Sequence, residues 1–365
     1  MINIFFTPQP IIPSSCIEDI TVQSDSEYID VLIYADNTAL LSERYYLNVG
    51  IVSISNLREL VEQYLAGNWQ KNLVTCNLDI KTPRGEKENV AFKVIYCDRI
   101  PNVSNLSEWL HQNFLTLAPF RRVALSDNIP LSWFATTGEE LGVIVDVTYL
   151  DTDGSRAVIS FPFSNETLKA PSDDTYNIII SPALILNRIK ETLDSASILI
   201  QLITVRCGER CISLFLDPSL DSGKRFYFLN CFNVLECLNI HCTIKEKISS
   251  DRSIASLGRI SQFYDVSNSM EYETETGPLT LDYGILLQQM LSSSLVKVTC
   301  NHSQAIEDFD SFYKILITDY TCELSDSNQE LNKVKFTWRF ADNIPLMNLH
   351  SSSGIFSEPY NPFFS

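Results

Sequence analysis

The chain has 365 residues, of which 45% are hydrophobic and 20% are charged, and its formal net charge is −18 at pH 7. This length predicts two or three globular domains with ample apolar material for their cores. An acidic surface of this kind repels phosphate backbones, which argues against sequence-specific binding of nucleic acid and against anionic membranes.

The first 27 residues are predicted to form an extended arm, since Pro8, Pro10 and Pro13 interrupt regular structure. They lack the basic region and long apolar core of a signal peptide. No run of about 18 apolar residues occurs, so we expect no membrane insertion. Ten cysteines without a signal peptide indicate reduced thiols in a cytoplasmic setting.

Residues 28–165 are predicted to form a β-rich domain with two helices. A helix is expected over residues 57–65, whose apolar residues recur at i, i+3 and i+4, with Asn56 and Glu59 as a capping box and Gly67 at its end. The second helix follows Asn105. Strand signals occupy 28–35, 38–52, 72–80, 88–97, 119–134 and a hairpin at 141–163.

The polar segment 164–175 is the predicted linker, and a second β-rich domain with two helices is expected over 176–350. Ser181 and Pro182 open one helix, and the other carries an apolar stripe from Tyr283 to Leu291. The basic, polar residues 248–262 are predicted to be a loop. The pentapeptide DNIPL occurs at 127–131 and again at 342–346. This repetition has two possible origins, which are coincidence and duplication of a domain.

The longest β-like run is GKRFYFLNCFNVLECLNIHCTIKEK, residues 223–247. Apolar side chains fall on both of its faces, which is typical of a strand covered on both sides. Asn230 and Asn233 are expected to interrupt it with a bend or bulge. Together these features predict an α+β, mostly β protein with two antiparallel β-rich domains, each packed with amphipathic helices.

Candidate metal ligands gather in this run as Cys231, Cys237, His241 and Cys242. Zinc needs four donors around one point, whereas an extended strand of about 3.3 Å per residue, unless a sharp turn interrupts it, separates Cys231 from His241 by roughly 30 Å. We therefore expect buried structural cysteines and no metal. Cys207 and Cys211 flank a turn and could form half a metal site or a disulfide, although no second pair accompanies them.

Other motifs also point away from catalysis and cofactors. DSGKR at 221–225 lacks the first glycine of a phosphate loop, and a strand follows where a helix is required. The acidic turn at 151–154 lacks the closing glutamate of a calcium loop. The four histidines share no motif. The residues therefore predict no enzyme, no cofactor and no metal.

Several segments, taken in order, resemble one group of proteins. They are YYLNVGIVSISNLRELVEQYL, FKVIYCDRI and FLTLAPFRRVALSDNIPLSWF in the first half, and RFYFLNCFNVLECLNI, TGPLT, LVKV, FTWRFADNIPL and IFSEPYNPFF in the second. The chain is similar along most of its length to proteins encoded in phages and prophages of Bacteroidetes bacteria, which look like tail-tip or baseplate components and resemble distal tail proteins.

This resemblance implies a structural protein that builds or adapts the end of a phage tail tube, made in the bacterial cytoplasm and located in the virion. Its partners would be other tail or baseplate proteins, and it would form a closed cyclic oligomer, a hexamer or trimer. One alternative is a receptor- or glycan-binding module, which needs exposed aromatic residues from among Trp69, Trp109, Trp133, Trp338 and the tyrosines. Another is a cell-wall-degrading enzyme, which needs a carboxylate or thiol in a cleft.

Residues 351–365 form an aromatic tail that Pro359 and Pro362 keep from becoming a helix. An apolar terminus of this kind is expected to dock, either on its own domain or in a groove of a neighbouring subunit or tail protein. The residues predicted to make this protein contact are Phe356, Tyr360, Phe363 and Phe364.

Overall fold

A computed structural model describes residues 1–6, 10–68, 71–103, 105–151, 153–163, 169–193, 198–257, 259–299, 312–324 and 332–342. Strands dominate it and helices lie between them, which confirms the predicted α+β, mostly β fold class. Its buried apolar residues gather in three large cores, which we call the first, second and third cores in chain order.

The first core lies between two sheets and helix α1 (Leu57–Ala66). One sheet has the order β1-β3-β6, with β1 (Ile2–Phe5), β3 (Ile20–Ser24) and β6 (Ile51–Ile54). The other has the order β2-β8-β7-β4-β5, with β2 (Ile12–Pro13), β8 (Lys87–Ile95), β7 (Leu73–Lys81), β4 (Tyr28–Ala35) and β5 (Thr38–Tyr46).

Two expectations for this region need correction. Residues 1–27 are extended in places, but they do not form a separate arm, because their strands pair within both sheets and Ile20 and Val22 are fully buried. Helix α1 lies where the periodicity predicts it, but Asn56 does not close a capping box. Its backbone is left-handed, with φ of 63°, and its side chain makes no capping hydrogen bond.

The second core is enclosed by a five-stranded and a two-stranded sheet together with helix α3 (Pro182–Leu193). The larger sheet has the order β12-β11-β14-β15-β9, with β12 (Arg156–Pro162), β11 (Val143–Leu150), β14 (Leu199–Cys207), β15 (Arg210–Leu216) and β9 (Phe120–Val123). The smaller pairs β10 (Ile129–Ala135) with β13 (Asp174–Ile180). Helix α2 (Leu106–Gln112) precedes them and is capped by Asn105, whose side chain accepts from Glu108 N.

Strands from both sides of the predicted linker at 164–175 pair with each other around the second core. β10 pairs with β13, and β11 pairs with β14. The predicted linker therefore does not coincide with a boundary between hydrophobic cores, and residues 164–168 lie outside the described part of the chain.

The third core lies between a seven-stranded sheet and helix α4 (Leu281–Ser292). The sheet has the order β17-β16-β20-β21-β22-β19-β18. Its strands are β17 (Leu235–Ile240), β16 (Lys224–Leu229), β20 (Val296–Val298), β21 (Tyr313–Cys322), β22 (Val334–Phe340), β19 (Ile260–Thr276) and β18 (Cys242–Leu257). Two short 3-10 helices, Ser14–Cys16 and Pro218–Ser222, complete the described elements.

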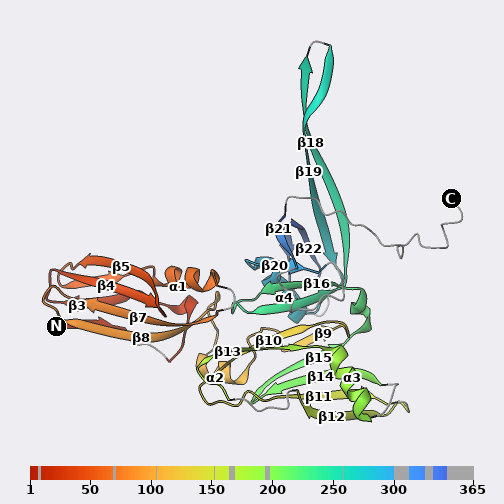
Figure 1. Ribbon diagram of the computed structural model, residues 1–365, viewed down its shortest axis with the longest axis horizontal. Coiled ribbons are helices and arrows are strands. Elements are labelled where there is room, and N and C mark those ends of the chain that lie inside the picture. Colours follow the sequence, from red (N-terminus) through yellow and green to blue (C-terminus); the bar gives the residue numbers. More distant parts are fainter. Residues whose placement is uncertain are drawn as a thin grey trace.

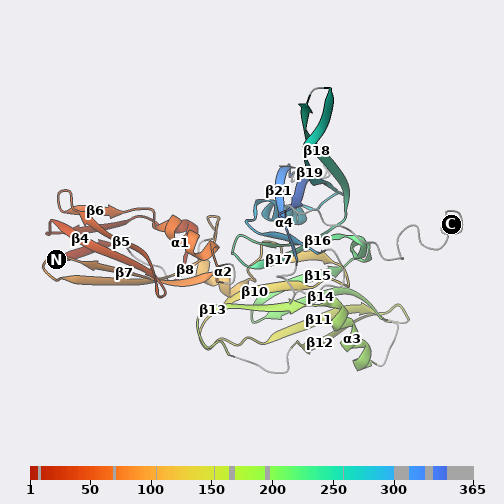
Figure 2. The same cartoon turned by 45° about the horizontal axis from the view of Figure 1, so that its top comes forward.

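The prediction of a loop over residues 248–262 is wrong. These residues lie in β18 and β19, which form one long antiparallel hairpin. Figures 1 and 2 show this hairpin standing clear of the body, while the sheets of the first core extend to one side of the second and third cores. The second DNIPL segment and the aromatic tail lie outside the described residues, apart from Asp342.

Candidate functional site

The turn at residues 230–233 joins β16 to β17, at the centre of the run that the sequence singles out. Its interruption was predicted, and the structure shows a tight hairpin turn. Asn230 closes the turn because its Oδ1 accepts from the Phe232 backbone N–H at 2.9 Å. Asn233 adopts a left-handed backbone with φ of 56°, which asparagine tolerates better than most residues.

This turn binds the first and second cores through hydrogen bonds to their backbones. Nδ2 of Asn230 donates to the carbonyl of Leu115 at 2.7 Å, and Nδ2 of Asn233 donates to the carbonyl of Leu65 at 2.9 Å. The carbonyl of Cys231 accepts from the Asp98 N–H at 3.1 Å. Because Leu65 ends α1 and Leu115 follows α2, the turn is a junction between parts of the chain far apart in sequence.

A small apolar cluster surrounds the same junction. Cys231, Phe232 and Val234 pack with residues from the first-core sheets, α2 and β10. Trp109 stacks on Phe232, with ring centroids 5.4 Å apart and planes inclined by 22°. Stacked aromatic pairs add about 0.5–1.5 kcal/mol beyond the burial of their area, so the cluster stabilises the junction as well as filling it.

Two buried ion pairs fix the third core to the second. Arg121 of β9 pairs with Glu236 of β17, and their side chains are 3% and 2% exposed. Arg225 of β16 pairs with Asp127 at 2.5 Å, with exposures of 3% and 2%. The remaining hydrogen-bonding capacity is largely used. Arg121 also donates to Thr116 Oγ1 and Ala118 O, and Asp127 also accepts from Asn239 Nδ2 and the Ala124 N–H.

Asp173 links the first core to the second in the same way. Its carboxylate pairs with Lys93 of β8 and accepts 2.8 Å hydrogen bonds from the N–H and Oγ1 of Thr137. The hydrogen bond from Lys93, supported by those from Thr137, lowers the pKa of Asp173 to about 2. The carboxylate is therefore ionised at any physiological pH, and the link between these cores is electrostatic.

One histidine lies beside a carboxylate, which is an arrangement that acid–base catalysis also uses. His111 Nδ1 is 3.3 Å from Glu139 Oε2. Although partial burial opposes ionisation, the Arg210 hydrogen bond at 2.6 Å and that from the Thr136 N–H lower the pKa of Glu139. Arg210, which is 1% exposed, also donates to two backbone carbonyls. These contacts hold the side chains in a fixed structural cluster. The pKa of Glu139 is lowered, whereas a general acid needs a raised one.

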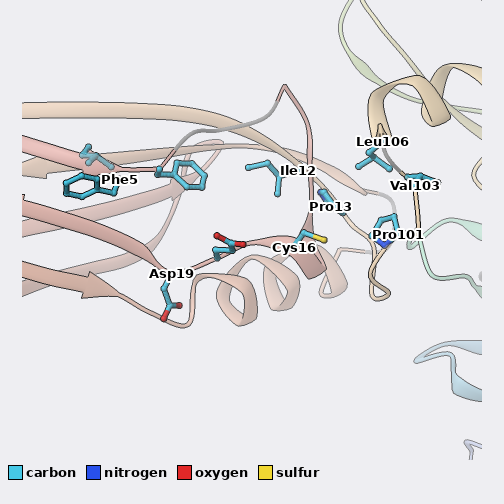
Figure 3. A pocket seen from close by; sticks show the side chains of 11 residues that line it. Phe5, Ile12, Pro13, Cys16, Asp19, Pro101, Val103 and Leu106 are labelled. Atoms are coloured by element: carbon cyan, nitrogen blue, oxygen red, sulfur yellow. The ribbon is translucent and has the colours of Figure 1, made fainter.

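A cavity of about 680 Å³ opens beside β1, β2 and the segment that leads to α2 (Figure 3). Most of its lining residues are apolar, among them Phe5, which is 61% exposed, and Val103, but polar atoms make up the larger part of its surface. The groups with reactive chemistry among its described lining are the Cys16 thiol and the carboxylates of Glu18 and Asp19. The cavity therefore combines apolar side chains with a thiol and two carboxylates.

The predicted metal ligands are not brought together. Cys231 lies in the junction cluster, Cys237 packs near Tyr227, and Cys242 lies at the margin of the third core. Cys207 and Cys211 do not face each other, because Cys207 is opposite Arg210 and Cys211 is opposite Arg206. Within the described residues, no group of three metal-ligating side chains occurs, and the nine described cysteines are unpaired.

The tryptophans that a glycan-binding module could use differ in their exposure and in the core to which they belong. Trp133 and Trp338 are 3% and 2% exposed and belong to the second and third cores. Trp109, predicted to lie in a helix core, packs half-buried on Phe232. Trp69 and the predicted contact residues Phe356, Tyr360, Phe363 and Phe364 lie outside the described residues.

Sequence reasoning missed the most prominent exposed feature, the β18–β19 hairpin. β22 flanks β19 over Tyr272–Glu275 only, as far as the described residues show. From Lys247 to Leu257 the hairpin therefore projects for eleven residues, about 35 Å at the usual rise per residue. The signal in the sequence is the spacing of Ile244, Ile248 and Ile254 by even numbers of residues, which the charged residues and serines between them obscure.

The two faces of this hairpin differ in chemistry. One face carries Ile248 and Ile254, which are 65% and 61% exposed, and Phe263, which lies opposite Ile254 and is 53% exposed, and it also carries Glu246 and Arg252. The other face is charged, with Lys245 opposite Glu273 and Lys247 opposite Glu271. The apolar face continues that of the third core, since Tyr272 stacks on Trp338 with ring centroids 4.4 Å apart.

No protein-family model and no curated protein matches the chain. Two solved structures resemble it weakly. One is of a 1.5-MDa bacterial ice-binding adhesin, with 8% identity over 76% of this chain and 92% of that chain and a TM-score of 0.16. The other is of a Ca²⁺-stabilized adhesin with which an Antarctic bacterium binds ice, with 5% identity, coverage of 76% and 69%, and a TM-score of 0.15. Likeness this low carries no argument about fold or function.

None of the described helices combines the length and apolar character needed to cross a membrane.

Proposed function

We propose that this protein is a structural component of a phage tail, at the tail tip or baseplate, where it builds or adapts the end of the tail tube. It acts there with other tail or baseplate proteins in a cyclic oligomer, a hexamer or trimer, and it is not an enzyme. The proposal begins from the resemblance of its sequence segments to phage and prophage proteins.

The observation that carries this proposal is the projecting β18–β19 hairpin. A component of an assembly needs surface that its own fold leaves uncovered, and exposed apolar surface of this kind is typical of protein contacts. The hairpin stands clear of the body (Figure 1), and its Ile248, Ile254 and Phe263 are 65%, 61% and 53% exposed. A second observation supports the proposal. The buried charged side chains between the second and third cores pair with each other, Arg121 with Glu236 and Arg225 with Asp127, and so hold these cores together.

The direct test is the composition of purified virions from a phage that encodes this chain. We expect mass spectrometry to find the protein in a fixed number of copies per particle, and gold-labelled antibodies to bind at the tail end. Deleting its gene should produce particles whose tails are absent or unfinished. Intact, infectious virions that contain none of the protein would exclude a tail component.

A further inference from the structure

Among the described residues, no strand pairs with β18 on the side away from β19, which leaves an open edge along the hairpin. β18 is the last strand of the seven-stranded sheet, and over Cys242–Leu257 its partner among the described residues is β19. An open edge is a template for another strand. A ribbon of two strands is also marginally stable alone, whereas three or more strands with an apolar face are stable. The hairpin beyond Lys247 thus lacks the support that a neighbouring strand would supply.

We propose that β18 pairs antiparallel with β18 of a second copy of this chain, about a two-fold axis at Ser249. This contact joins two hairpins into one four-stranded sheet. Each residue then lies opposite the residue equally far on the other side of Ser249 in the partner. The same patch is used by both copies, as in any two-fold contact, so this contact is separate from the contacts between neighbours within a cyclic ring.

The charges of β18 fit this register. Glu246 lies three residues before Ser249 and Arg252 lies three residues after it, so each Glu246 faces an Arg252 across the axis. Both side chains are exposed. In the same way Lys247 is placed opposite position 251, which is an aspartate. The axis therefore relates four pairs of opposite charge and opposes no like charges.

The two registers shifted by one residue are disfavoured by the same residues. A shift of one residue in one direction places Lys245 opposite Arg252, and a shift in the other direction places Lys247 opposite Arg252. Like charges directly opposite each other destabilise a sheet. Lysines on an edge strand ordinarily discourage pairing. Here they discourage the wrong registers and permit the one centred on Ser249.

The apolar residues fit as well. Ile244 and Ile254 lie five residues on either side of Ser249, so each faces the other across the axis. A two-fold axis perpendicular to the sheet leaves the apolar faces of both hairpins on the same side. The pairing therefore places the isoleucines of both hairpins on one face, with the Glu246–Arg252 pairs between them, and partly covers Ile254, which is 61% exposed in the single chain.

A cysteine at the axis tests this geometry directly. In the proposed pairing the two Ser249 residues lie directly opposite, with Cα atoms about 4.5–5.5 Å apart, which a disulfide spans. We expect Ser249→Cys to form an intermolecular disulfide rapidly under mild oxidation of the full chain. Ser253→Cys, on the same strand and face, is the matched control. Its two copies lie eight residues apart along the pair and are not expected to crosslink.

A charge exchange tests the register. Glu246→Arg places arginine opposite Arg252, and we expect it to weaken dimerisation about tenfold or more, as measured by sedimentation equilibrium at low salt. Arg252→Glu should weaken it similarly. The double variant Glu246→Arg with Arg252→Glu restores opposite charges and should restore dimerisation. Raising the salt concentration should weaken the wild-type dimer and narrow these differences.

The proposal is overturned if the full chain stays monomeric at tens of micromolar, if both cysteine variants crosslink equally, or if the double variant fails to recover. These measurements use purified protein and need no virion. A protein that dimerises in this way but is absent from virions would refute the tail role and leave the β18 contact established.

Discussion

Loss of one charge from the buried pair between Arg121 and Glu236 should loosen the joint between the second and third cores. We predict that Glu236→Gln, which preserves shape and removes the charge, lowers the free energy of unfolding by about 3 kcal/mol. The two side chains are 3% and 2% exposed, so water cannot compensate the remaining guanidinium. Breaking a buried pair costs about 3–5 kcal/mol, and the lower value applies because glutamine can still accept a hydrogen bond.

Urea unfolding followed by tryptophan fluorescence measures this effect, because Trp133 and Trp338 lie in the two cores that the pair joins. Asp30→Asn is the matched control. It removes a charge from the pair with Arg44, whose side chains are 48% and 49% exposed, and it should shift the midpoint little. The double variant Arg121→Met with Glu236→Leu should recover most of the loss, since no buried charge remains. Equal midpoints for Glu236→Gln and Asp30→Asn would refute this reasoning.

Three further outcomes are expected. The pKa of Asp173 lies below its ordinary value of 3.8, so its ion pair with Lys93 stabilises the fold above about pH 4 and is lost as the pH falls towards 2. The variant Asp173→Asn should therefore lose the pH dependence of unfolding that this ion pair contributes in that range. In the native protein a thiol reagent should modify the exposed Cys16 and Cys211 quickly but should not modify Cys76, because burial raises the pKa of the Cys76 thiol to about 12. After full denaturation without reductant, most of the cysteines should react as free thiols. Deleting residues 354–365 should leave a folded, soluble protein that assembles poorly, whereas loss of cooperative melting would place the tail in its own core.

Local pattern was sufficient for the helices and for many strands. Helix α1 was expected over 57–65 and occupies Leu57–Ala66, and α3 begins at the predicted Pro182. These elements follow from apolar spacing and from residues that start or end helices, which act within a few positions. The β-like character of residues 223–247 was also recognised, although this run forms β16, a hairpin turn, β17 and the start of β18 rather than one strand.

The hairpin and the junction could not be predicted in this way. Residues 248–262 are rich in serine and charge, and their strand conformation depends on pairing between β18 and β19 rather than on burial. Likewise, no local feature of Asn233 indicates that it binds the carbonyl of Leu65, 168 positions earlier. The predicted linker at 164–175 was chosen for its polarity, which does not reveal that β10 and β13 pair across it.

The position of the 230–233 turn in the chain has a consequence for the order of folding. Domains made on the ribosome generally fold from the N-terminus onward, so α1 and the residues around Leu115 are synthesised long before Asn230 and Asn233. Until the turn emerges, the carbonyls of Leu65 and Leu115 lack the amide donors that they have in the finished protein. The first and second cores can thus each form early, while their hydrogen bonds to this turn come late, after the strands of both cores have been made.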